Sequence, residues 1–145
     1  MRLQKVYDAF KERADFYWIY VREAHPADGF RPAQHVSVAQ PTTFARREEV
    51  VVTCAAHFQL MIPVLVDDMG DSVAKAYDAF PDRLFILNAD GTIAYRGDRG
   101  PRGFKVDEME QALAKLAPET SQAKESAPRQ SRDRRGVRRT PNIKR

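Results

Sequence analysis

Apolar and polar residues alternate along the first 116 positions with spacings that switch between helical and strand-like. The apolar residues from Leu3 to Phe10 recur three or four positions apart, which predicts a helix that ends at Ala14-Asp15. Phe16–Val21 is an unbroken run of aromatic and β-branched residues, which predicts a strand. Because this run is apolar on both faces, we expect the strand to lie in the buried centre of a sheet.

The pattern changes again after residues 26–43, a segment rich in proline. A long irregular segment inside a compact domain usually has a function. Beyond it, Thr43 is placed to cap a helix, of which Phe44, Val51, Cys54, Ala55 and Phe58 fall on one face. The remaining predicted elements are a strand at Pro63–Val66, a short helix at Gly70–Ala79, a hairpin of Arg83–Leu87 and Thr92–Arg96, and a final helix lined by Val106, Met109, Leu113 and Leu116.

Charge divides the chain into two parts. Residues 117–145 hold nine Lys or Arg and three Asp or Glu, a net charge of +6. Residues 1–116 hold 15 Lys or Arg and 17 Asp or Glu, a net charge of −2. The basic part has almost no large apolar residue, so we expect a folded domain at 1–117 and a disordered tail at 118–145. Two interpretations of the tail stay open. It either attaches electrostatically to RNA or another polyanion, or it is a solubilising extension. The absence of aromatic residues that could stack on bases favours the solubilising extension.

Composition excludes several classes of protein. No apolar run approaches the length of a membrane span, and the N-terminus lacks the apolar stretch of a signal peptide, so we expect a cytoplasmic protein without membrane contact. The single cysteine, Cys54, excludes an intramolecular disulfide and a CxxC couple. Its place late on an apolar helix face predicts a small buried side chain rather than a reactive thiol. One cysteine and three histidines have no metal-ligand spacing, so no metal site is expected.

The candidate chemistry follows the strand at Phe16–Val21. Arg22, Glu23 and His25 come together at its end, and ligands of open α/β sheets bind at the ends of strands. One interpretation is a solvated strand end at which Glu23 pairs with Arg22. The other is a carboxylate and an imidazole that exchange a proton.

An ordered set of motifs resembles the iodothyronine deiodinase family. The set begins with Tyr-x-x-Glu-Ala-His at residues 20–25 and Gln34-His35, and spans roughly residues 3 to 116. Its later members are PVLVDDM (63–69), the tyrosine and proline of YDAFPDRLFIL (77–87), DGTIAYRG (90–97) and RGPRGF (99–104). The resemblance implies an α/β, thioredoxin-like fold with a peroxiredoxin-like β-α insertion, without the first strand and the catalytic loop of that fold. We expect Phe16–Val21 beside Arg83–Leu87 inside one mixed sheet.

The resemblance also implies roles for individual residues. Glu23 and His25 would relay a proton, Tyr20, His35 and Arg99 would bind substrate, and Pro81 would be a cis proline near the site, although a trans proline that ends the preceding helix is the alternative. All these residues are expected to converge on one cleft at the C-terminal end of the strands. No cofactor is expected.

Two classes of function remain open. The first is reductive dehalogenation of a small aromatic substrate, with a thiol as reductant, or peroxidase-like chemistry. The family's selenocysteine or cysteine nucleophile is missing from the sequence, so we expect that Met1 is not the natural start and that the chain alone is inactive. The second is a non-catalytic redoxin-like module whose basic tail binds RNA or a partner. Whether the chain forms a homodimer is left open by the sequence.

Overall fold

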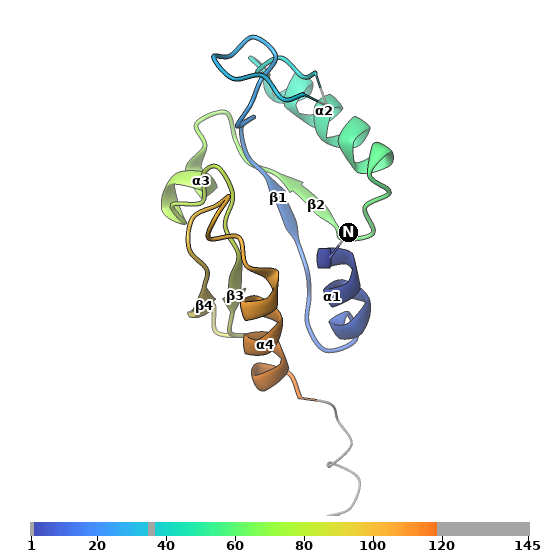
Figure 1. Ribbon diagram of the computed structural model, residues 1–145, viewed down its shortest axis with the longest axis vertical. Coiled ribbons are helices and arrows are strands. Elements are labelled where there is room, and N and C mark those ends of the chain that lie inside the picture. Colours follow the sequence, from blue (N-terminus) through green and yellow to red (C-terminus); the bar gives the residue numbers. More distant parts are fainter. Residues whose placement is uncertain (1, 35–36, 119–145) are drawn as a thin grey trace, which may run out of the picture.

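The computed structural model describes residues 2–34 and 37–118 and contains both helices and strands, as expected (Figure 1). The predicted tail at 118–145 lies outside the described residues, apart from Pro118. Along the described chain the elements are α1 (Arg2–Phe10), β1 (Trp18–Tyr20), α2 (Phe44–His57), β2 (Val64–Val66), α3 (Ser72–Ala76), β3 (Phe85–Leu87), β4 (Ile93–Arg96) and α4 (Val106–Leu116).

Local signals in the sequence located most of these elements. The Thr43 hydroxyl accepts a hydrogen bond from the Arg46 backbone N–H at 3.2 Å, which confirms the predicted cap of α2. The hairpin of β3 and β4 and the final helix form where they were predicted. The Phe80–Pro81 bond is cis, as the resemblance implied. Helix α3 is shorter than predicted, because Asp71 before it and Asp78 after it have positive φ angles of 55° and 51°.

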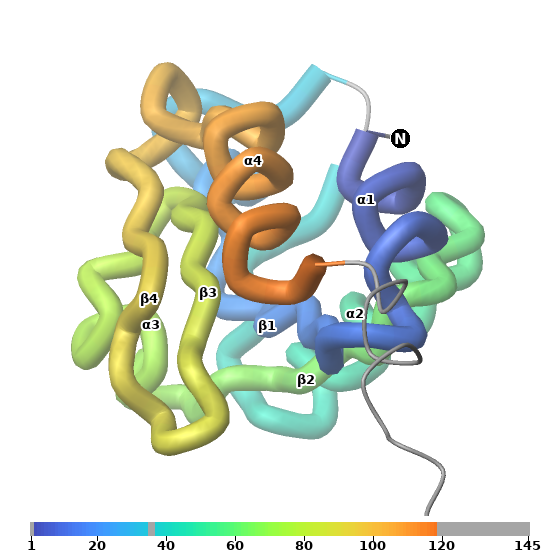
Figure 2. The backbone as a smooth tube through the Cα atoms, turned by 90° about the horizontal axis from the view of Figure 1, so that it is seen from below, coloured from blue at the N-terminus to red at the C-terminus, as the bar shows by residue number. Residues whose placement is uncertain are grey.

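The expectation of one central sheet is wrong. Strand β1 pairs in parallel with β2, with Ile19 opposite Leu65, and β3 pairs antiparallel with β4, so the structure has two separate two-stranded sheets. Figure 2 shows the two strand pairs from below. Among the strands of residues 2–34 and 37–118, β1 pairs only with β2 and β3 only with β4, so β1 and β3 share no ladder.

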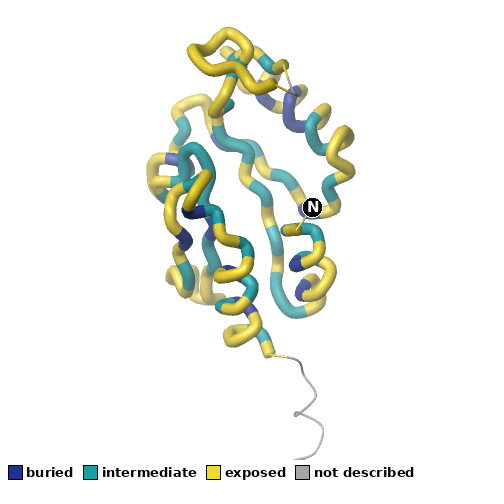
Figure 3. Tube along the Cα trace, viewed as in Figure 1, coloured by how far each residue is buried: buried dark blue, intermediate teal, exposed yellow. Residues whose placement is uncertain are grey.

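Strand β1 is also less buried than predicted. Ile19 is 40% exposed and its partner Leu65 is 47% exposed, so one face of this strand pair is open (Figure 3). The other face packs under α2. The prediction assumed cover on both faces, and within the described part of the chain only one face has it.

Two groups of buried side chains hold the molecule. An apolar cluster joins α1, the start of β3 and α4 through Val6, Phe10, Leu84, Met109 and Leu113. Between α2 and the chain after β2, the most buried side chains are instead Arg47 and Asp67, each 2% exposed. Of the helices in the described ranges, none is long and apolar enough to cross a bilayer.

Candidate functional site

Tyr20 and Glu23 form the centre of the candidate site. Tyr20 ends β1, and its hydroxyl donates a hydrogen bond to the Glu23 carboxylate. Burial raises the pKa of Tyr20, and the hydrogen bond and the negative charge of Glu23 raise it further. Tyr20 therefore keeps its proton at neutral pH and remains a donor that orients Glu23. The alternative pairing of Glu23 with Arg22 does not occur.

Helix α2 brings Cys54 close to this pair. Burial, and secondarily the charge of Glu23, raises the pKa of the Cys54 thiol, so the thiol is protonated at neutral pH. Cys54 is half-buried rather than fully buried, and the expectation of a buried filler is wrong because it lines a cavity of about 370 Å³. The residues around this cavity are Ser37, Val38, Arg46, Val50, Thr53, Cys54, His57 and Phe58.

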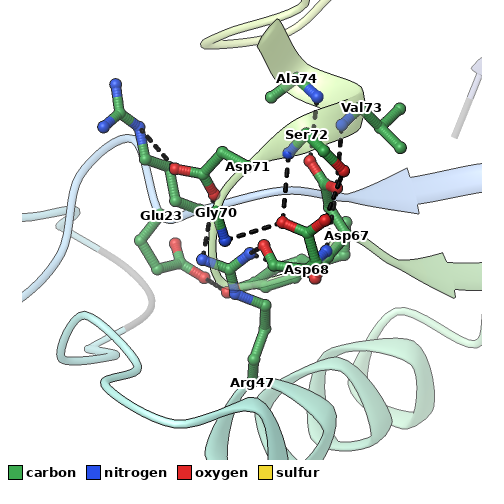
Figure 4. A network of polar contacts seen from close by, with 11 residues as sticks. Glu23, Arg47, Asp67, Asp68, Gly70, Asp71, Ser72, Val73 and Ala74 are labelled. Atoms are coloured by element: carbon green, nitrogen blue, oxygen red, sulfur yellow. Dashed lines mark hydrogen bonds and ion pairs between the residues drawn. The ribbon is translucent and has the colours of Figure 1, made fainter. Parts of the chain in front are cut away.

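A buried arginine fixes the chain beside Glu23. Arg47 donates hydrogen bonds to the backbone carbonyl oxygens of Asp67 and Asp68, at 3.2 and 2.5 Å, and to the carboxylate of Asp71 at 3.1 Å. Figure 4 shows its guanidinium between α2 and this acidic segment, with Glu23 in the same group of side chains. Five donors in a rigid fork allow one arginine to hold several chain segments at once.

The acidic segment in turn forms the start of α3. The Asp67 carboxylate accepts from the backbone N–H groups of Val73 and Ala74, at 3.0 and 2.9 Å. Asp68 accepts from the N–H groups of Gly70 and Ser72, at 2.7 and 3.2 Å, and from the Ser72 hydroxyl. These bonds satisfy donors that a helix start leaves without partners (Figure 4).

Sequence reasoning missed Arg47. The helical spacing of apolar residues placed Val51 on the buried face of this helix. It gave no reason to expect a charged side chain on the same face. The available signal was an arginine one turn before Val50 and Val51, followed by the aspartate-rich segment 67–71. A buried charge needs a partner, so such a pair of signals predicts an internal ion pair.

The turn at Pro81 forms a second part of the site. The Arg22 guanidinium carbon lies 4.1 Å from the centroid of the Phe80 ring, which connects the end of β1 to this turn. Arg99 donates to the carboxylate of Asp78, which also pairs with Arg83 at 3.0 Å. Desolvation raises the pKa of Asp78, but Arg99 and Arg83 outweigh it and lower this pKa overall. Arg99 is therefore tied to Asp78, three residues before Pro81 in the chain.

The histidines are less well connected. The His25 Nδ1 atom lies 3.0 Å from the backbone carbonyl oxygen of Arg31, within the loop. Within residues 2–34 and 37–118, His25 forms no hydrogen bond or ion pair with Glu23 or Arg99, and His35 lies outside these ranges. The structure thus joins Tyr20 to Glu23 and Arg99 to Asp78, whereas the convergence of all the predicted residues stays a prediction. Nor does any cluster of three metal-ligating side chains occur in these ranges.

Comparison with known proteins gives a consistent match. The iodothyronine deiodinase family model matches residues 1–117. Thyroxine 5-deiodinase of Ovis aries is 33% identical over 114 residues, which are 73% of this chain and 36% of that protein. The Homo sapiens protein of the same name is 32% identical over 114 residues, and the Sparus aurata protein is 33% identical over 111. Each alignment covers 73% of this chain but only 34% and 39% of those two relatives. The chain therefore spans about a third of the length of the curated relatives it matches.

Proposed function

Because this chain belongs to the iodothyronine deiodinase family, we propose that it serves reductive dehalogenation of a small halogenated aromatic substrate, with a cellular thiol as reductant. The observation that carries the proposal is the Tyr20–Glu23 hydrogen bond, within the matched residues and at the end of a strand.

The proposed reaction needs a proton where the halogen leaves. A selenolate or thiolate takes the halogen as a halonium equivalent, the electron pair of the broken bond stays on the ring carbon, and that carbon takes a proton. One thiol then displaces halide ion from the resulting chalcogen halide and forms a bond between the chalcogen and its sulfur, and a second thiol breaks that bond, which restores the nucleophile and forms a disulfide. Glu23 and His25 are proposed to supply the proton, while Tyr20, His35 and Arg99 bind and orient the ring.

Cys54 is not the proposed nucleophile. Attack on a halogen requires the thiolate, and the raised pKa of Cys54 keeps the protonated form. We expect the 145-residue chain alone to release no iodide from an iodinated phenol, with or without Cys54→Ser.

The fold is proposed to be thioredoxin-like, with β2 and α3 as the peroxiredoxin-like insertion. The support is the order of the elements; the two separate strand pairs of the described residues differ from the single sheet of that fold. A crystal structure with α1 and α4 on opposite sides of β1 would contradict this assignment, since both helices pack on one apolar cluster.

The test supplies the nucleophile from solution. Iodide release from an iodinated phenol by a soluble selenol is measured with the full chain, with Glu23→Gln and with Arg2→Gln, an exposed arginine on α1. The chain should accelerate iodide release by the selenol. Glu23→Gln should lower that acceleration at least about tenfold, whereas Arg2→Gln should leave it unchanged. Equal rates with the chain and with Glu23→Gln would overturn the role of Glu23.

A second candidate function is ligand binding without catalysis. It is favoured by the raised pKa of Cys54, the one cysteine of the sequence. Binding of the iodinated phenol, measured by calorimetry, without any acceleration of iodide release would favour this candidate. Acceleration that depends on Glu23 would exclude it.

A further inference from the structure

One carboxyl oxygen at the turn of Pro81 is buried without a hydrogen bond. Asp82 follows Pro81 directly, and its Oδ1 atom accepts no hydrogen bond from residues 2–34 and 37–118. Burial raises the pKa of Asp82, because the ionised form loses its hydration. A buried acceptor without a donor lowers stability, so its presence in a folded protein calls for an explanation. None of the steps of the proposed reaction uses this carboxyl group.

The carboxyl group of Asp82 packs against the backbone of Gly100. A Cβ atom built on Gly100 would collide with Oδ1 and with the carboxyl carbon of Asp82. Only glycine therefore lets the two segments of the chain come this close. The Gly100 N–H also donates a hydrogen bond to the backbone carbonyl oxygen of Asp82 at 3.0 Å. Asp82 thus meets Gly100 through both its main chain and its side chain.

This contact holds the loop that carries Arg99. Where the loop begins, the Gly97 N–H donates a hydrogen bond to the backbone carbonyl oxygen of Leu84 at 2.9 Å. Three residues later, Gly100 meets Asp82. The loop is therefore attached on both sides of Arg99, and a displacement of Gly100 would move the backbone from which the Arg99 side chain starts.

We propose that Asp82 is a positioning residue, which sets the place of Arg99 through its contact with Gly100. The relevance to catalysis rests on the proposed function, in which Arg99 orients the substrate ring. The pairing of Arg99 with Asp78 does not replace this contact, because the Asp78 side chain is 51% exposed and an exposed ion pair holds a flexible side chain only weakly. The packed backbone contact therefore determines which region the guanidinium can reach.

The experiment compares a collision with its relief in the full chain. Gly100→Ala places a methyl group against the Asp82 carboxyl group, whereas in the double variant with Asp82→Ala the methyl group takes the space that the carboxyl group leaves. The Arg99 Nε–H signal in proton–nitrogen NMR spectra, assigned with Arg99→Lys, should move in Gly100→Ala and return in the double variant. Gly100→Ala should also weaken binding of the iodinated phenol at least about fivefold, and the double variant should recover it to within about twofold.

Three further variants serve as controls. A Cβ atom built on Gly97, in the same loop, would lie 3.4 Å from the nearest atoms, so Gly97→Ala should move the Arg99 signal less than Gly100→Ala does. Asp82→Asn keeps the shape of the carboxyl group and should move the signal less than Asp82→Ala, which leaves a gap beside Gly100. This second pair decides the question even if Gly100→Ala does not fold.

The outcomes separate the contact from the reaction. An Arg99 signal that Gly100→Ala leaves in place, or that the double variant does not restore, would overturn the positioning role of Asp82. Equal signals in Asp82→Asn and Asp82→Ala would overturn it as well. Restoration of the Arg99 signal without any change in phenol binding or iodide release among these variants would support the contact and count against the role of Arg99 in the proposed function.

Discussion

Hydrophobic side chains form the buried cluster of one part of the molecule, whereas the other part combines buried apolar residues with a polar network. Five buried apolar residues join α1, β3 and α4, from Val6 to Leu113. Around α2, β2 and α3, the deepest side chains are Arg47 and Asp67, and the large residues Ile19 and Leu65 of the adjoining strands stay 40% and 47% exposed. Figure 3 shows that both regions contain buried segments.

The difference matters because the two kinds of contact constrain structure differently. Apolar burial is non-directional, so it stabilises α1 and α4 without fixing the direction of any functional group. The bonds of Arg47 and Asp67 have defined partners and directions, and they fix the segment beside Glu23 and Arg22. We infer that the apolar cluster supplies stability and that the polar network supplies geometry for the candidate site.

The largest effect is expected from breaking the polar network. Arg47→Met should lower the free energy of unfolding by about 3–5 kcal/mol, because it leaves Asp71 and two backbone carbonyls without their buried partner. Urea denaturation measures this change. Amide hydrogen exchange should speed up at Val73 and Ala74 more than in α4, if the two regions are held separately.

The neighbouring arginine provides the matched control. Arg46 is 62% exposed and pairs with Glu49 on the same helix, so Arg46→Met should change stability by less than about 1 kcal/mol. Equal effects of Arg46→Met and Arg47→Met would show that the network does not hold this region.

A somewhat smaller effect is expected from the apolar cluster. Leu113→Ala should cost about 3 kcal/mol through lost burial and the cavity that remains. Under conditions where the protein is folded, Leu113→Ala should leave the binding of the iodinated phenol unchanged in calorimetry, whereas Arg47→Met should weaken it. Leu116→Ala, at a residue of the same helix that is 50% exposed, is the control and should cost much less. Loss of ligand binding by Leu113→Ala would remove the distinction between the two regions.

The same distinction explains what the sequence could predict. The spacing of Val106, Met109 and Leu113 located α4, and the Thr43 cap located the start of α2, because both signals are local. Tyr20 and Glu23 were recognised as candidates because they belong to one short motif, and the structure joins them. These features depend on neighbours within a few residues.

Non-local features were missed. The partners of Arg47 lie 20 to 24 residues away, so no helical pattern contained them. The joining of β1 to β3 in one sheet was expected from the order of the elements and from the family resemblance. The apolar run Phe16–Val21 shows a preference for burial but not which strand pairs with it. The stack of Arg22 on Phe80 likewise depends on chain folding.

A further prediction tests how far the polar region depends on the start of α2, which carries Arg47. Thr43→Ala removes the acceptor for the Arg46 N–H and should cost about 1 kcal/mol. Thermal unfolding measures this loss. Thr43→Ser keeps the acceptor and should restore most of the stability, whereas a Thr43→Ser variant as unstable as Thr43→Ala would show that the cap bond is not the cause.

The smallest expected effect is a pH dependence confined to the polar region. Hydrogen bonds from Ser72 and Gly70 lower the pKa of Asp68 in the folded protein. A carboxylate with a lowered folded pKa stabilises the fold above its unfolded pKa of about 3.9, and this contribution disappears as pH falls through the folded pKa. The stability difference between the unaltered chain and Asp68→Asn should therefore be constant from neutral pH down to about 5 and shrink in more acidic solution. Thermal unfolding from pH 7 to pH 2 measures it, with Asp15→Asn, at an exposed residue after α1, as the control. A difference that instead grows as the solution becomes more acidic would show that these hydrogen bonds do not favour the ionised form of Asp68.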